Sequence, residues 1–205
     1  MKKISLILIA IAGLVPGWTQ QPAVISLFEK EAITYMREEE KLARDVYDSM
    51  YAKWAVNPFG NIRFSEQTHM NKMNTLIKKY QLEDPVAKND DRPGVFTNNT
   101  LQQLYDELTS SGSKSLTDAL RAGAKIEELD ITDLHQRAAQ TKQPDILTTY
   151  QNLTAASENH LRAFVRRLSM QGVNYTPVIL SQAEFDEIIA AAHKETKEQG
   201  CGGCK

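Results

Sequence analysis

The chain has 205 residues, and its 24 Lys and Arg side chains are balanced by 26 Asp and Glu side chains, which gives a formal net charge of −2. This mild acidity argues against nucleic acid as the main partner, because domains that bind nucleic acid carry a surplus of basic side chains. The length suits one domain with a substantial hydrophobic core.

The N-terminal segment has the pattern of a secretory signal peptide. Lys2 and Lys3 precede an apolar run over residues 4–15, which is too short to span a membrane. We therefore expect residues 1–22 to be removed, and the protein to be exported to the periplasm or the cell exterior without a membrane span. Because no Ala-x-Ala cleavage site follows the apolar run, an uncleaved N-terminal anchor is the alternative.

The rest of the chain has helical periodicity and no persistent strand pattern. Apolar residues recur three or four positions apart in four long segments, residues 26–54, 62–80, 115–139 and 144–172. A fifth helix is expected over residues 181–197, where Ser181 and Glu184 can form a capping box. The connections after the first and the third helix are short, whereas residues 81–114 form a long connection with a short helix near 100–109.

Two helical hairpins joined by one long crossover are typical of the ferritin-like four-helix bundle. We therefore predict an all-α fold, in which residues 23–198 form such a bundle with an additional C-terminal helix. A flexible tail is expected over residues 199–205, and it contains both cysteines. Cys201 and Cys204 could form a disulfide in a small loop or bind a soft metal ion.

Each long helix carries an acidic residue or a histidine in register with its apolar neighbours. These inward positions are, in chain order, Glu40, Glu66, His69, Glu127, Asp130 and His160. Buried charges are costly unless an opposite charge or a metal ion compensates them. Glu38 and Glu39 fall outside this register and are expected to be solvated, whereas Glu128 and Glu158 are reserve candidates in case the helices are rotated slightly.

The charges of these residues favour a site for two metal ions. Four carboxylates carry four negative charges, which two divalent cations would neutralise, with the two histidines as neutral ligands. A ligand set of oxygen and imidazole without thiolate suits iron or manganese better than structural zinc. The alternative is a set of buried ion pairs, but the inward positions contain no Lys or Arg unless Arg167 turns inward.

Several segments resemble known families. The sequence from Glu40 to Tyr47 and the Glu66-x-x-His69 motif are similar to those of rubrerythrin, a member of the ferritin-like superfamily. Residues 37–47, 65–70, 126–131 and 159–164 more closely resemble the prokaryotic family called domain of unknown function 2202, and the resemblance covers about residues 33–172. Ser157 stands where a second Glu-x-x-His motif would place its glutamate, which implies an asymmetric site.

The resemblance implies a non-haem di-iron or di-manganese protein that performs oxidoreductase chemistry on dioxygen or peroxide, of the ferroxidase or peroxidase type. Tyr47, Tyr150 and Ser157 would then hydrogen-bond the ligands, although the two tyrosines could also carry a radical or simply pack in the core. Two other functions stay open. One is a metal-binding or sequestration module of the cell envelope without turnover, and the other is a purely structural helical bundle.

Overall fold

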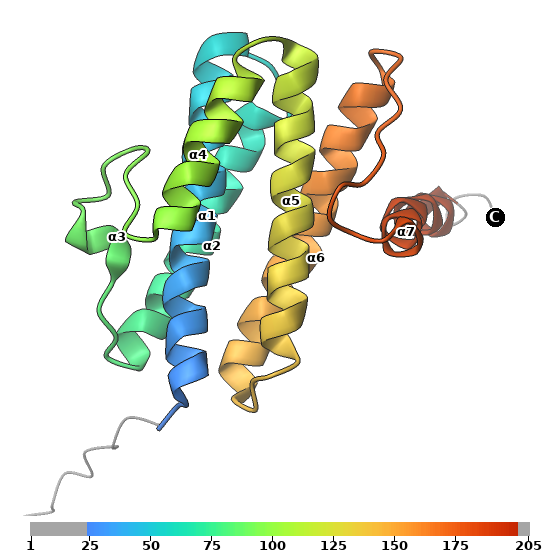
Figure 1. The fold of residues 1–205 in the computed structure, drawn as a ribbon. Helices are drawn as coiled ribbons and strands as arrows, with labels where there is room; N and C mark the ends of the chain where they lie inside the picture. Colours follow the sequence, from blue (N-terminus) through green and yellow to red (C-terminus); the bar gives the residue numbers. More distant parts are fainter. Residues whose placement is uncertain (1–23, 201–205) are drawn as a thin grey trace, which may run out of the picture.

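A computed structural model describes residues 24–200, with side chains up to residue 191, and every regular element in this range is a helix. Four long helices lie side by side (Figure 1): α1 (Leu27–Trp54), α2 (Phe59–Lys79), α5 (Leu116–Ala138) and α6 (Pro144–Ser169). The two hairpins α1–α2 and α5–α6 pack on each other through α1 and α5 and through α2 and α6. This arrangement confirms the all-α prediction, and the helix ends differ from the predicted ones by at most three residues.

The ends of the helices have clear local causes. The Ser26 side chain accepts a hydrogen bond from the Glu29 backbone N–H, and the Glu29 carboxylate accepts one from the Ser26 N–H, which together form a capping box at the start of α1. The Ser115 side chain caps α5 by accepting a hydrogen bond from the Asp118 backbone N–H, and Pro144 occupies the first turn of α6. These caps satisfy N–H groups that the first helical turn leaves free.

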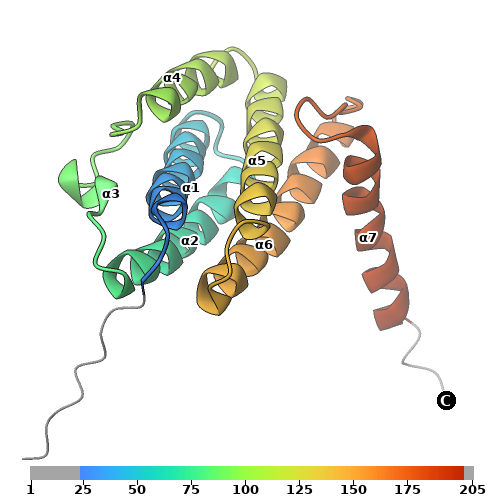
Figure 2. The same ribbon diagram turned by 60° about the horizontal axis from the view of Figure 1, so that its bottom comes forward.

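The long crossover between α2 and α5 contains α3 (Pro85–Lys88) and α4 (Asn99–Gly112), and both helices pack on α1 (Figure 2). The Glu38 carboxylate accepts hydrogen bonds from the backbone N–H groups of Thr97 (2.5 Å) and Asn98 (3.0 Å) in this crossover. The expectation that Glu38 and Glu39 are solvated is therefore wrong. Both are buried because the crossover and α5 cover the faces of α1 that local periodicity assigns to solvent.

Two basic side chains of α1 also bind the crossover to this helix. The Lys41 ammonium is fully buried, pairs with Asp45 and donates to the Arg92 carbonyl oxygen at 2.9 Å. The Arg44 guanidinium pairs with both Asp45 and Asp91. With these contacts α1 has neighbours on all sides, and every residue from Met36 to Tyr47 is buried.

A glycine allows α5 and α6 to approach each other closely. A Cβ atom on Gly123 would overlap the ring of Phe164, which is fully buried and packs against Tyr47 and Phe59 with 5.3 Å between ring centroids in each case. This ring cluster forms part of the core at one end of the bundle.

We expect the Gly123→Ala substitution to lower the free energy of unfolding by about 1–2 kcal/mol. Overpacking in a dense core costs about 1–3 kcal/mol, which outweighs the gain of up to about 1 kcal/mol in helix propensity. Urea unfolding measures the change. The Gln136→Ala substitution at an exposed position of the same helix is the control, with an expected change within about 0.5 kcal/mol. Unchanged stability in Gly123→Ala would show that α6 can move away without cost.

The last described helix, α7 (Gln182–Gly200), lies beyond α6, on the side away from α1 and α2 (Figures 1 and 2). Its Phe185 and Ile188 side chains are buried. No helix within residues 24–200 has the length and apolar character needed to cross a membrane. The predicted signal peptide and the Cys201/Cys204 pair lie outside the described residues.

Candidate metal centre

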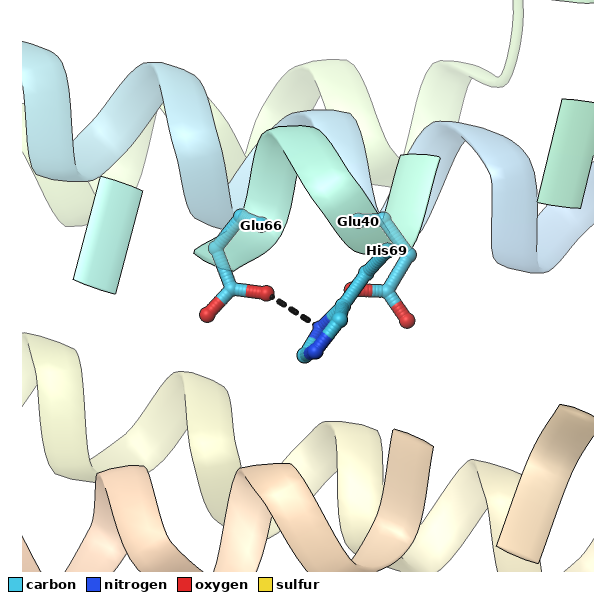
Figure 3. A group of neighbouring side chains, drawn as sticks. All are labelled: Glu40, Glu66 and His69. Atoms are coloured by element: carbon cyan, nitrogen blue, oxygen red, sulfur yellow. Dashed lines mark hydrogen bonds and ion pairs between the residues drawn. The ribbon is translucent and has the colours of Figure 1, made fainter. Parts of the chain in front are cut away.

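Helices α1 and α2 bring three of the predicted ligands together. The Nδ1 atom of His69 lies 2.8 Å from Oε2 of Glu66 and 3.2 Å from Oε2 of Glu40. All three residues are at most 2% exposed. Figure 3 shows the two carboxylates on either side of the imidazole, with all three side chains pointing toward α5 and α6.

A second group forms where α2 faces α5 and α6. The Nδ1 atom of His160 lies 2.9 Å from Oε1 of Glu66 and 3.5 Å from Oε2 of Glu127. In each group the possible ligand atoms all lie within 4.8 Å of one another. Glu66 belongs to both groups and directs one carboxylate oxygen to each histidine, and the two imidazole rings stack with centroids 5.6 Å apart.

Several possible ligand atoms of the two groups have no hydrogen-bond partner in residues 24–200. Glu40 Oε1, Glu66 Oε1 and His160 Nδ1 are buried and have no hydrogen-bond partner among the described residues, so the close approach of His160 to Glu66 is not aligned as a hydrogen bond. Leaving such atoms unsatisfied in the interior is costly. A divalent cation fits this donor set, because carboxylate oxygens and imidazole nitrogens are ligands of iron and manganese.

The buried charges depend strongly on one another. Burial raises the pKa of Glu40 to about 7, although the neighbouring His69 opposes this shift. Burial alone would also raise the pKa of Glu66, but its contacts with His160 and His69 lower it to about 2. Conversely, the carboxylates raise the pKa of His69 to about 11 and that of His160 to about 10, against the effect of burial. The neighbouring carboxylates therefore favour the protonated form of both histidines in the absence of a metal ion.

Asp130 lies beside Glu40 but belongs to neither group within the described residues. Its Oδ2 atom accepts a 2.5 Å hydrogen bond from the Ser157 hydroxyl, and its Oδ1 atom has no partner in residues 24–200. Burial and the nearby carboxylates of Glu40 and Glu39 raise the pKa of Asp130 well above its usual value. Ser157 therefore holds Asp130.

The two tyrosines have different roles. The Tyr47 hydroxyl donates a 2.5 Å hydrogen bond to Glu127 Oε1 and so fixes one carboxylate of the second group. The assignment of Tyr150 to the same task is corrected by the structure. Its hydroxyl has no hydrogen-bond partner within residues 24–200, and its ring packs in an apolar cluster with Ile33 and Met36. Tyr150 is two helical turns from Ser157, too far along α6 to reach the ligands.

The reserve candidates Glu128 and Glu158 lie outside both groups. Glu128 is fully buried, but its carboxylate accepts hydrogen bonds from the Tyr175 hydroxyl and from the backbone N–H groups of residues 178, 179 and 180. Glu158 is partly exposed and lies 3.7 Å from Arg162. One step along a helix turns a side chain by about 100°, which directs both away from the centre.

The chain matches known proteins over most of its length. Residues 29–192 match the family described as "Uncharacterized protein domain (DUF2202)". The chain belongs to the DUF2202 family. The match spans all residues of both groups, from Glu40 to His160, so the candidate centre lies inside the DUF2202 domain.

A relative of this DUF2202 protein comes from Methanocaldococcus jannaschii and is named "Uncharacterized protein MJ0754". The two sequences are 51% identical over 168 residues, which cover 82% of this chain and 90% of the relative. A solved structure, described as the crystal structure of hypothetical protein MJ0754, aligns with a TM-score of 0.79 and 48% identity. That alignment covers 87% of this chain and 98% of the solved one, so the fold is shared across nearly the whole domain.

Proposed function

We propose that this DUF2202 protein is an exported, ferritin-like protein that binds two iron or two manganese ions in the centre of its bundle. The observation that carries the proposal is the position of Glu66, whose two carboxylate oxygens face two different histidines. A carboxylate shared in this way suits two adjacent cations, each with one histidine and one further glutamate. The export part of the proposal rests only on the signal-peptide pattern in the sequence of residues 1–22.

The connectivity supports the ferritin-like part of the proposal. Two antiparallel hairpins, α1–α2 and α5–α6, are joined by one long crossover that carries α3 and α4. Bundles of the ferritin type have one such crossover and place their metal ligands on the inward faces of all four helices. Glu40, Glu66, Glu127 and His160 come from the four different helices in this way.

The residues of the chain have separate tasks in this proposal. Glu40 and His69 would hold one ion, Glu127 and His160 the other, and Glu66 both. Two such ions, when bound, would supply redox chemistry on dioxygen or peroxide, of the ferroxidase or peroxidase type. Tyr47 fixes Glu127, so this ligand is held in place before a cation binds. Ser157 holds Asp130, which belongs to neither group in residues 24–200.

The burial of the centre favours one alternative, a metal-binding module without turnover. The side chain of His160 is the most exposed member of the two groups, at 11%, and the others are at most 3% exposed. Such a centre would retain a metal ion well and admit a second reactant poorly. Storage or sequestration in the cell envelope would require only the binding part of the proposal.

Metal reconstitution tests the proposal. Metal-free protein is incubated anaerobically with Fe(II) or Mn(II), desalted and analysed for metal content and melting temperature. We expect about two ions per chain and a higher melting temperature, because a ligand that binds only the folded state stabilises it. Less than about 0.2 ions per chain without a change in melting temperature would contradict metal binding and favour a purely structural bundle. Consumption of dioxygen or peroxide by the Fe(II)-loaded protein then separates an oxidoreductase from a sequestration module.

A further inference from the structure

Glu39 is a buried acidic residue for which neither the fold nor the proposed centre accounts. It is 2% exposed, and neither carboxylate oxygen has a hydrogen-bond partner in the described part of the chain. Its neighbour Glu38, in contrast, is fully engaged with the backbone of the crossover. A buried carboxyl group without hydrogen-bond partners is costly.

Other acidic residues continue from Glu39 in both directions. The charges that act most strongly on Glu39 are those of Asp133 and Arg137 on α5, followed by Glu40. Those that act on Asp130 are Glu40 and Glu39, followed by Glu127. Asp130 and Asp133 are three residues apart on one face of α5, and Glu39 and Glu40 are adjacent on α1, which packs against α5. The four carboxyl groups therefore lie along the contact between the two helices, and Glu40 belongs to the proposed centre.

The Asp133 end of this contact reaches the surface. Tyr35 and Arg137 line a cavity of about 520 Å³ between α1 and the crossover. The Arg137 guanidinium lies over the Tyr35 ring, 4.3 Å from its centroid, and donates a 3.3 Å hydrogen bond to Asp133. The side chains of Asp133 and Arg137 are 17% and 18% exposed, so both are accessible from solvent.

We propose that Asp133, Glu39 and Asp130 form the route by which a divalent cation passes from this cavity to the metal centre, and that Arg137 covers its entrance. The inference rests on the proposed function. Carboxylate oxygens can replace the water ligands of a cation step by step, and passages lined with one sign of charge concentrate ions of the opposite sign. Within residues 24–200 these carboxylates do not form a third group of close ligand atoms, which favours passage over stable binding.

Rapid mixing of metal-free, full-length protein with Co(II) tests the route, because coordination changes the visible absorption of Co(II). We expect Glu39→Gln to slow loading about tenfold, the lower end of the rate effects of focused electrostatic fields. Its final absorbance and dissociation constant should equal those of the wild type. The matched control is Glu107→Gln, which removes the same charge from an exposed side chain paired with Lys125 on another face. This control should load at the wild-type rate.

The outcomes separate the route from the function. If wild-type protein loads no Co(II), the proposed function fails. If wild-type protein loads and Glu39→Gln slows loading less than about threefold, the route alone is refuted. A Glu39→Gln protein with a lower final absorbance would make Glu39 a ligand and would also refute the route. Asp133→Asn, at the partly exposed outer end, provides a second variant and should slow loading in the same direction without changing the final absorbance.

Discussion

Replacing Glu66 with glutamine is expected to abolish metal binding at both positions. Glu66 is the one residue shared by the two groups, and a neutral amide cannot supply two anionic oxygens to two cations. After reconstitution with Fe(II) or Mn(II), metal analysis should find about two ions per chain in the wild type and fewer than about 0.2 in Glu66→Gln. The variant should still fold, because glutamine has the shape of glutamate.

Variants of the outer ligands provide the comparison for Glu66. Glu40→Gln and Glu127→Gln each change one group only. Each variant should therefore retain about one ion per chain, whereas Glu66→Gln should retain almost none. Glu158→Gln is the matched control, because it removes a carboxylate from α6 outside both groups and should bind metal as the wild type does. Equal metal content in Glu66→Gln and the wild type would contradict the shared carboxylate.

Replacing Glu128 with alanine is expected to lower the free energy of unfolding by about 3 kcal/mol. The change would remove the acceptor for the N–H groups of residues 178–180 and for the Tyr175 hydroxyl. Hydrogen bonds to a charged group contribute about 1.5–3 kcal/mol each, and unsatisfied N–H groups add a penalty, partly offset where water can reach them. Urea unfolding measures the loss.

The effect of Glu128→Ala should be greatest in the segment that holds α7. Chymotrypsin cleavage after Tyr175 should be faster than in the wild type, because release of residues 173–180 exposes this site. Glu187→Ala, which removes an exposed carboxylate from α7, should change stability by less than about 0.5 kcal/mol. Metal content should be unchanged in Glu128→Ala, and its loss would return Glu128 to the ligand set.

Helix positions and the inward polar residues were predictable because both depend on local spacing. A residue three or four positions from apolar neighbours shares their face, so Glu40, Glu66 and Glu127 could be assigned to the interior before any contact was known. The structure buries all three and brings them to the two histidines. The capping box at residues 181–184 is also local, and its side-chain hydrogen bonds are present.

Long-range contacts explain what spacing could not predict. Glu38 and Glu128 lie off the inward lines, and both are buried because distant loop segments place backbone N–H groups on them. Short-range periodicity has no information about where the crossover or residues 173–180 return to the bundle. Tyr150 lies on the inward face as predicted, but it packs in an apolar cluster away from the ligands. Periodicity assigns a residue to a face of the helix and does not specify the height along the helix at which the metal centre lies.

The burial of α1 on every face affects how the molecule opens. Most helices of a bundle have one solvent face, where amide hydrogens exchange after small local fluctuations. In α1, residues 36–47 lie beneath α2, α5 and the crossover, so no single neighbour can leave and expose the whole segment. Its amide hydrogens should therefore exchange only when the whole domain unfolds. Because Glu40 lies in this segment, we expect the candidate centre to be built on one of the most slowly exchanging segments of residues 24–200.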